Sequence, residues 1–395
     1  MIEIYAQQQY EDKFKSGFPL LMSSFIQYTP NTYKEGGFFK LFDTNNTFIA
    51  KGYLGKQNKG IGWILSWKEH ETIDRNFFMN KLIVALNKRT QYFEDPDTTA
   101  FRIFNGEGDG IGGFTIDYFD EYYLFNWYSE GIYTFRDEII DVFSQLVAYK
   151  GIYEKRRSDE NGSYVEGKDF VMGEPADFPI MVKENGVKIA VDLEDGPMVG
   201  VFLDQREVRK KLRDYYAKNK TLLNTFSYTG VFSVFALMGG AKMTESVDLA
   251  KRSTSLTIEQ MVINELDYDS QSIVVMDVFD YFNQAKEAGK RFDIVVLDPP
   301  SYARSKKNTF SAAKDYADLV GKALDLTEKD GMIIASTNHS GLKREKFWDM
   351  IEKGFESRGE RALKIESFKL PKDFAIHNQL RESDYLKVFF VKRKK

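Results

Sequence analysis

The chain has 395 residues, and since a single hydrophobic core stops growing at roughly 250–300 residues, two or three domains are expected. Hydrophobic residues make up 43% of the chain and charged residues 29%, which excludes a disordered or a fibrous protein. The absence of cysteine excludes disulfides, thiolate metal sites and a cysteine nucleophile, and with 3 histidines we expect no metal centre. The net charge is −4, so a polyanion would need a local basic face.

The cellular location follows from two patterns. No stretch reaches the ~18 consecutive apolar residues of a membrane span. The N-terminus lacks the basic flank and long apolar run of a signal peptide. We therefore expect a cytoplasmic protein that does not bind a membrane.

The first domain is expected over residues 1–73, which are rich in turns and aromatic side chains. Strands are predicted over 38–43, 48–54 and 61–67, and the first two are joined by a polar turn. A small β barrel fits this spacing.

A middle α+β domain is expected over residues 74–185, where Asp74 can cap a helix with one apolar face. Farther on, the glycine-rich segment 105–113 lies between two strand-like runs. A phosphate-binding loop is one interpretation of such a segment. However, Glu107 and Asp109 would repel phosphate and no helix follows directly, so a tight turn between two strands is favoured.

The last domain, residues 186–395, alternates strands with amphipathic helices, which predicts an α/β fold with a parallel, doubly wound sheet. The predicted strands are 221–225, 243–247, 272–276, 292–297 and 332–336. The predicted helices include 249–263, 312–326 and 344–355. Two strands then follow in succession, at 363–370 and 385–391, so we expect the last strand to run antiparallel.

Three of the strand ends carry side chains that suit a nucleoside, and ligands of open parallel sheets bind at the carboxyl ends of the strands. After the first strand, a turn with the single glycine Gly230 suits a ligand without phosphate, although an ordinary βα turn would look the same. The second strand ends in Asp248, which can accept both hydroxyls of a ribose or simply cap a helix. The third is followed by Asp277, which can accept from an adenine amine.

The fourth strand ends in the most specific motif of the chain, Asp298-Pro299-Pro300-Ser301-Tyr302. The prolines stiffen the backbone and remove two N–H groups, so nearby carbonyls are expected to be free for a substrate. Asp298 supplies a carboxylate on this support, and Tyr302 supplies a flat face for a base. Together the four strand ends predict a Rossmann-like S-adenosylmethionine methyltransferase, in which the protein aligns an activated methyl group with a nucleophile.

These motifs, with Val201–Arg206 (VFLDQR) and Phe104–Gly110, resemble the RlmI-type large-subunit (23S) ribosomal RNA methyltransferases. The resemblance implies an RNA-binding PUA-like barrel, a mixed α+β domain and a Rossmann-like methyltransferase domain, in that order. It implies cofactor contacts from Phe202, Asp204, Gln205, Asn224, Phe226, Tyr228, Gly230, Asp248, Asp277, Phe279 and Asp298. It places a catalytic group at the target base, formed by Asp298, Pro299, Pro300 and Tyr302.

One departure from that family bears on the acceptor atom. The family's cytosine-C5 members look built around a cysteine that follows the fifth strand. At that place this chain has Ser336–Gly341 (STNHSG). A pyrimidine ring carbon needs a thiolate to become a nucleophile, whereas guanine N7 already has a free lone pair. An exocyclic amine would need only hydrogen bonds to a carboxylate and a carbonyl. The resemblance to cysteine-free enzymes of this build, and to other families with an Asp-Pro-Pro motif that act on rRNA guanines, implies direct in-line methylation of a guanine nitrogen, N7 first. A cysteine-independent cytosine methyltransferase, a non-catalytic RNA-binding or ribosome-assembly factor, and a methyltransferase for proteins or small molecules are the alternatives.

The expected partner is 23S ribosomal RNA, free or in a pre-ribosomal large-subunit particle, and a homodimer is left open. RNA binding is expected from basic side chains that could hold phosphates. The candidates are Lys155, Arg156, Arg304, Lys306 and Lys307, with Lys51, Lys56, Lys59 and Lys68 on the barrel. A solvated face is the alternative for each cluster. His339 is either a base contact or an ordinary loop residue.

Overall fold

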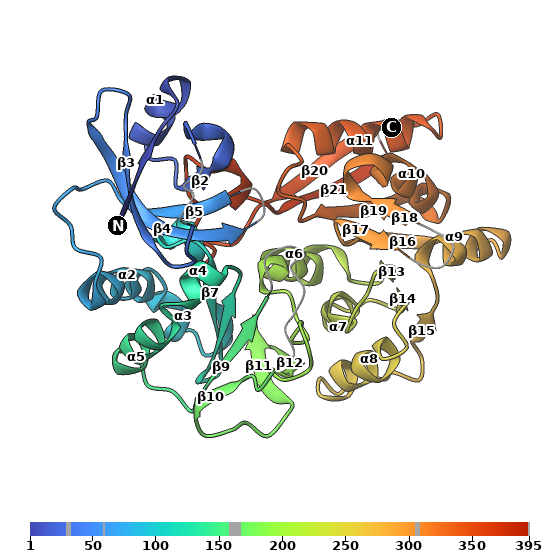
Figure 1. Ribbon diagram of the computed structural model, residues 1–395. Coiled ribbons are helices and arrows are strands. Elements are labelled where there is room, and N and C mark those ends of the chain that lie inside the picture. Colours follow the sequence, from blue (N-terminus) through green and yellow to red (C-terminus); the bar gives the residue numbers. More distant parts are fainter. Residues whose placement is uncertain (29–32, 58–59, 158–166, 305–308, 394–395) are drawn as a thin grey trace. The chain divides into compact units, whose positions relative to one another are not determined.

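Figure 1 shows the computed structural model of the chain, which describes residues 1–28, 33–57, 60–157, 167–304 and 309–393. The chain folds into two compact units. The first holds residues 1–182, 191–199 and 372–383, and the second holds residues 183–190, 200–371 and 384–395. Segment 372–383 thus belongs to the first unit, although the residues before and after it belong to the second. The finer boundaries expected at 73/74 and 185/186 stay a prediction.

The N-terminal sheet of the first unit is the predicted barrel. Its strand order is β1-β3-β4-β5-β2, and all pairs are antiparallel except β1 with β3. An antiparallel bridge pairs Ala6, directly after β1, with Ile26, which follows β2 and a 3₁₀ turn. The strands are β1 (Ile2–Tyr5), β2 (Leu20–Met22), β3 (Phe38–Phe42), β4 (Phe48–Gln57) and β5 (Gly60–Ser66), with the short helix α1 (Glu11–Lys15).

A second sheet follows, with strand order β10-β9-β8-β7-β6. Asp74 caps its first helix as predicted, since one carboxylate oxygen accepts from the backbone N–H of Phe77 at 3.1 Å. Its strands are β6 (Ala100–Asn105), β7 (Phe114–Phe119), β8 (Tyr122–Trp127), β9 (Gly151–Arg156) and β10 (Phe170–Gly173). Its helices are α2 (Arg75–Lys88), α3 (Thr90–Phe93), α4 (Glu130–Tyr133) and α5 (Arg136–Leu146). Barrel and second sheet share one buried apolar cluster, in which the Tyr53 hydroxyl donates to the Gly112 carbonyl at 2.7 Å.

The glycine-rich segment is the turn between the antiparallel strands β6 and β7, which confirms the favoured interpretation. A single 3₁₀ turn, Gly106–Asp109, makes the connection. A Cβ atom on Gly108 would lie 1.9 Å from the carbonyl oxygen of Ala375, so the close approach of segment 372–383 requires glycine here.

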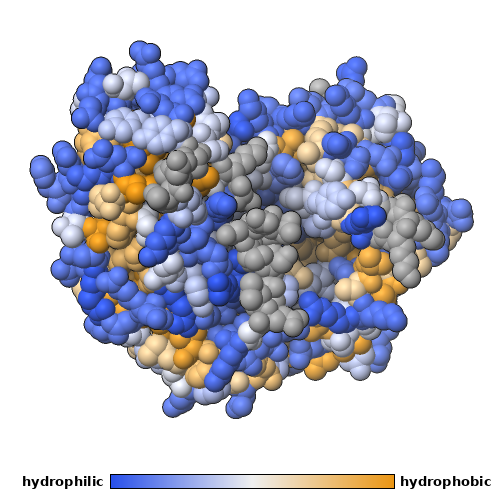
Figure 2. Space-filling model, viewed as in Figure 1, coloured by the Kyte–Doolittle hydropathy of each residue, from blue (hydrophilic) through white to orange (hydrophobic). Residues whose placement is uncertain are grey.

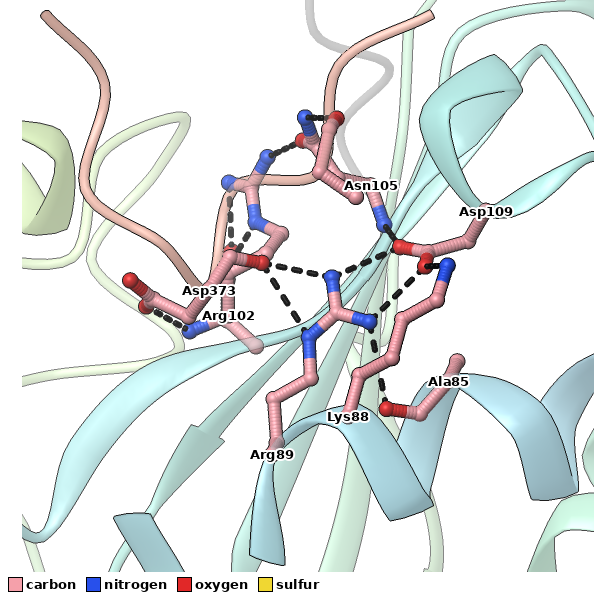
Figure 3. Close-up of polar contacts among 9 residues, drawn as sticks. Ala85, Lys88, Arg89, Arg102, Asn105, Asp109 and Asp373 are labelled. Atoms are coloured by element: carbon pink, nitrogen blue, oxygen red, sulfur yellow. Dashed lines mark hydrogen bonds and ion pairs between the residues drawn. The ribbon is translucent and has the colours of Figure 1, made fainter. Parts of the chain in front are cut away.

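A buried ion pair holds segment 372–383 in the first unit (Figure 3). Arg89 is 1% exposed and binds Asp109 in bidentate fashion, at 2.8 and 2.7 Å. Its Nε also donates to the carbonyl oxygen of Asp373 at 3.1 Å. The Asp373 carboxylate accepts from the backbone N–H of Arg102 at 2.9 Å, and the Asn105 amide donates to the Ala375 carbonyl at 2.8 Å.

The sheet of the second unit has the order β15-β14-β13-β16-β19-β21-β20. The five strands from β15 to β19 are parallel, and β21 is antiparallel to both neighbours, which confirms the predicted α/β fold and the antiparallel last strand. The strands are β13 (Thr221–Thr225), β14 (Met243–Asp248), β15 (Ser272–Val275), β16 (Phe292–Leu297), β19 (Thr327–Thr337), β20 (Ala362–Phe368) and β21 (Lys387–Arg393).

Helices cover both faces of this sheet, as Figure 1 shows for α7 and α8 on one side and α10 and α11 on the other. Alternate residues of one strand enter different cores: Val295 packs with α9, α10 and α11, whereas Ile294 and Val296 pack with α6 and α7. The helices are α6 (Arg206–Lys211), α7 (Val231–Met238), α8 (Ser253–Val262), α9 (Val278–Glu287), α10 (Ala312–Asp325) and α11 (Arg344–Glu356).

Three details differ from the expectation. The helix predicted from residue 249 begins at Ser253, because residues 249–252 form a turn in which Ser253 donates to the Ala250 carbonyl at 3.0 Å. A hairpin of β17 (Tyr302–Arg304) and β18 (Thr309–Ser311) follows the fourth strand, where the sequence suggested only a turn. Separately, β11 (Ile180–Glu184) and β12 (Val187–Val191) form a two-stranded sheet.

The surface is mostly polar on the face drawn in Figure 2, where apolar side chains lie in separate small areas. In the described part of the chain, no helix has the length and apolar character needed to cross a bilayer.

We predict that Arg89→Met destabilises the protein by about 3–5 kcal/mol, because it leaves the Asp109 carboxylate buried without its main partner. Denaturant unfolding monitored by tryptophan fluorescence measures the change. The neighbouring Lys88 also contacts Asp109, at 3.1 Å, but its side chain is 48% exposed. Lys88→Met is therefore the matched control, with an expected loss below about 1 kcal/mol. Equal losses in the two variants would contradict the role assigned to Arg89.

Candidate active site

The parallel register brings the ends of four strands to one edge of the sheet. Thr225 at the end of β13 lies opposite Val247 of β14 and Leu297 of β16. Leu297 in turn lies opposite Ala335 of β19. Because these strands end nearly in line, the loops that follow them meet at the same edge, where open α/β sheets bind ligands.

The loop after β13 has an unusual backbone. Phe226, Tyr228 and Gly230 have φ values of 54°, 51° and 73°, all in the left-handed region. For the two non-glycine residues this costs roughly 1–2 kcal/mol each. At Gly230 a Cβ atom would also lie 2.5 Å from the Thr257 side chain. Strain of this kind persists only where the surroundings enforce it, and it clusters at functional sites.

Buried hydrogen bonds support this loop from below. The amide of Asn224, 2% exposed, donates to the Ser233 hydroxyl at 3.1 Å, and Ser233 bonds to the Ser246 hydroxyl at 2.7 Å. The side chain of Asn224 therefore fixes β13 to α7 and β14. The contact of Asn224 with the cofactor remains a prediction. The hydrogen-bond network gives Asn224 a supporting role that sequence reasoning missed.

Asp248 holds the loop from the neighbouring strand. Its Oδ2 accepts from the backbone N–H of Tyr228 at 2.9 Å, and its Oδ1 accepts from that of Ala250 at 2.9 Å. It does not cap α8, whose N-cap is Arg252. Each carboxylate oxygen keeps a second lone pair, which can accept from a ribose hydroxyl.

Asp277 and Phe279 lie at the start of α9, after β15. Asp277 is the N-cap of this helix, and its side chain accepts from the Phe279 backbone N–H at 2.9 Å. The Phe279 ring lies 5.8 Å from that of Phe310, between centroids. The pair presents a carboxylate beside an aromatic wall, as adenine binding would require, and that role stays a prediction.

The segment before α6 contacts the same loop. The Gly200 N–H donates to the Tyr228 hydroxyl at 2.8 Å, and the Thr229 hydroxyl donates to the Gly200 carbonyl at 2.6 Å. The Phe202 ring is 46% exposed and lies 5.6 Å from the Tyr228 ring. Asp204 accepts from the Tyr385 hydroxyl at 2.9 Å, a partner that sequence reasoning missed.

Asp298 follows β16 and is half-buried. The Gln205 amide donates to its Oδ1 at 3.1 Å, and the same nitrogen donates to the Ser336 hydroxyl at 2.7 Å. Burial raises the pKa of the Asp298 carboxyl to about 6, and the nearby Asp204 acts in the same direction. Hydrogen bonds from Ser336 and Gln205 and the charge of Arg209 oppose that rise in the pKa. The carboxyl therefore changes its charge close to neutral pH.

The rest of the proline motif leads into the β17–β18 hairpin. Pro299 is buried, Pro300 is exposed and Tyr302 is 62% exposed, so its ring is available to a base. The expectation of free carbonyls needs a correction at Ser301, whose carbonyl accepts from the Ala312 N–H at 3.0 Å. The Ser301 hydroxyl donates to Asn338 at 2.7 Å and so joins the motif to the loop after β19.

The predicted RNA-binding side chains have different surroundings. Lys155 is fully buried and its ammonium lies 2.9 Å from the Asp169 carboxylate, so it is not available to phosphate, contrary to expectation. Arg156 pairs with Glu130, and Arg304 is exposed on β17. Lys306 and Lys307 lie outside the described residues. Lys51 on the barrel is also buried, and its ammonium donates to the Glu69 carbonyl at 2.6 Å.

Comparison with known proteins shows the family to which the chain belongs. Residues 156–358 match the model of a family of S-adenosylmethionine-dependent methyltransferases, and residues 5–67 match a PUA-like domain. The chain is 51% identical to the protein YwbD of Bacillus subtilis (strain 168), over 97% of each chain. The name of YwbD assigns that protein provisionally to the ribosomal RNA large subunit methyltransferases. This chain is 30% identical to the ribosomal RNA large subunit methyltransferase I of Pseudoalteromonas translucida (strain TAC 125), over 98% of each chain.

Among solved structures, the chain is similar to SMU.776, whose crystal structure is a complex with SAH. The TM-score is 0.92 at 40% sequence identity, and the match covers 99% of this chain and 100% of that one. The likeness therefore extends through both compact units.

We predict that Asp248→Ala weakens the binding of S-adenosylmethionine by roughly 1–3 kcal/mol, or about 5- to 150-fold in Kd, because ribose hydroxyls would lose their acceptor. Isothermal titration calorimetry measures this change. Asp349→Ala, at an exposed position on α11, is the control and should bind like the unaltered protein. An unchanged Kd in Asp248→Ala would remove Asp248 from the cofactor site.

Proposed function

We propose that this chain, which belongs to the family of S-adenosylmethionine-dependent methyltransferases, methylates a guanine of large-subunit (23S) ribosomal RNA, with N7 as the first choice of acceptor atom. The observation that carries the proposal is Asp298, a half-buried carboxylate in the motif that ends in the exposed Tyr302, in a chain without cysteine. The names of its relatives and its PUA-like domain support ribosomal RNA as the substrate.

On the cofactor side, S-adenosylmethionine supplies a methyl group on a positively charged sulfur. The strained loop with Tyr228 and Gly230 forms the floor of the cofactor site, and Asp248 accepts hydrogen bonds from the ribose hydroxyls. Asp277 and Phe279 bind the adenine. Phe202 and Asp204 lie toward the methionine end, as the family resemblance implies. The carboxylates of this set also favour a cationic ligand electrostatically.

On the base side, Tyr302 stacks on the guanine and Asp298 accepts from the N–H groups of its Watson–Crick edge. Methylation at N7 requires no proton removal, because N7 has a free lone pair. The product ring carries the positive charge that leaves the sulfur, so an ionised Asp298 nearby stabilises the transition state. Arg304, on the strand that begins with Tyr302, is placed to hold a flanking phosphate.

A covalent route through a ring carbon is a poor fit for this chain. It would require a thiolate nucleophile, and the sequence contains no cysteine. A cytosine acceptor would therefore have to react by a cysteine-independent route. A non-catalytic RNA-binding or ribosome-assembly factor is the other alternative, and it would not depend on the charge of Asp298.

The first test measures methyl transfer to RNA from a strain that lacks the gene. Free 23S rRNA and isolated large-subunit particles are incubated with labelled S-adenosylmethionine, and the nucleosides are identified by mass spectrometry. We expect 7-methylguanosine in one of the two substrates. Asp298→Asn should lower the single-turnover rate by roughly 10- to 1,000-fold. Asp318→Asn, on the surface of α10, is the control and should leave the single-turnover rate unchanged. Label on a pyrimidine carbon, or full activity in Asp298→Asn, would contradict the proposal.

The second test is the pH dependence of the same reaction. The pKa of the Asp298 carboxyl is raised to about 6, so the carboxylate is present above that pH and is lost as the pH falls through it. Below about pH 6 the single-turnover rate should therefore fall by about tenfold per pH unit. The slow Asp298→Asn variant should show no such decline. A rate that stays constant in the unaltered enzyme from about pH 8 to about pH 5 would rule out the ionised form as the active one.

A further inference from the structure

We propose that Gln205 is a positioning residue that holds the Asp298 carboxylate in place by joining the ends of β16 and β19. This inference rests on the proposed function, because it gives Asp298 a supporting partner for methyl transfer. The family resemblance implies only a cofactor contact for Gln205.

The contacts come from one atom. The side-chain nitrogen of Gln205 donates to Asp298 Oδ1 at 3.1 Å and to the Ser336 hydroxyl at 2.7 Å. A primary amide has two N–H groups, so both are used. The carboxylate can only accept when ionised, which requires that the nitrogen of the amide faces it. Gln205 is 3% exposed, so little of its surface remains for a ligand.

The second anchor, Ser336, is itself fixed. The fully buried Tyr316 hydroxyl lies 2.7 Å from the Ser336 carbonyl oxygen and 3.1 Å from that of Leu297, and its single proton is shared between them. Leu297 directly precedes Asp298. Tyr316 of α10 therefore links the end of β16 to β19, and Gln205 links the same two strand ends through Asp298 and Ser336. Gln205 is thus bound to a rigid part of the sheet.

Gln205 is also held from its own side. It ends a single 3₁₀ turn, Leu203–Gln205, and α6 begins at the next residue. In α6, Arg209 donates to the Phe202 carbonyl at 2.9 Å and pairs with Glu184 at 2.8 Å, and both charged side chains are buried. The turn that carries Gln205 is therefore immobilised by a buried ion pair.

The amide suits this position better than a cation would. Asp298 faces Asp204 on the same turn as Gln205, Arg209 on α6 and the Tyr316 hydroxyl on α10. Of these, Arg209 is the cation, and it is paired with Glu184. A lysine in place of Gln205 would bring a positive charge toward a sulfonium donor. A neutral amide donor orients the carboxylate and stabilises its ionised form without repelling the cofactor.

The test uses the full-length enzyme with Gln205→Met, which keeps the length of the side chain and removes both donors. We expect the single-turnover rate at about pH 8 to fall roughly 10- to 100-fold. The Kd for S-adenosylmethionine should stay within about threefold, because the amide acts on Asp298. The acid limb of the pH profile should move to higher pH, since a hydrogen bond that lowers the pKa of Asp298 is lost.

Two further variants separate positioning from folding. Gln205→Glu keeps the shape but adds a second carboxylate, so the acid limb should move farther toward high pH than in Gln205→Met. In the Asp298→Asn background, Gln205→Met should cost less than about threefold, because the group that it positions has already lost its charge.

Three outcomes would overturn the inference: an acid limb that does not move in either variant, rate losses that multiply in the double variant, or a large loss of cofactor affinity, which would make Gln205 a cofactor contact. If Gln205→Met does not fold, the Gln205→Glu profile decides. If the unaltered enzyme transfers no methyl group to RNA, the proposed function fails instead, and the two failures are distinguishable.

Discussion

The parallel register of the second unit's sheet is the constraint on which the site depends. Asp248 ends β14, Asp298 follows β16, and the strained loop at Gly230 follows β13, so no local interaction brings them together. Parallel strands that end in line place all three at one edge. The helices on the two faces make this possible, since strands covered on both sides can be apolar throughout and still be buried.

Within that edge, the polar side chains are paired in a way that suits a cationic donor. The carboxylate of Asp248 is held by backbone N–H groups, and that of Asp298 by a neutral amide. The nearby guanidinium of Arg209 is paired with Glu184. The proposed site therefore combines carboxylate acceptors with rigidity that comes from neutral donors.

The first unit relies on a different kind of bond. The bidentate pair of Arg89 and Asp109 is almost completely buried, and Arg89 also binds the backbone of Asp373. Desolvation offsets much of the attraction within a buried pair, whereas removal of one partner leaves a buried charge uncompensated. Here Arg89 holds segment 372–383 through Asp373, which lies 284 residues from it in the chain.

The sequence by itself determined three of the five barrel strands, the alternation of strands and helices after residue 186, and the chemistry that lack of cysteine excludes. Those features follow from local periodicity and composition, which do not depend on distant residues. Tertiary structure alone decided that Lys155 is buried against Asp169, that Asp109 binds Arg89 and that Gln205 bonds to Asp298. Gln205 and Asp298 are 93 residues apart, and only the packing of whole elements determines which distant side chains meet.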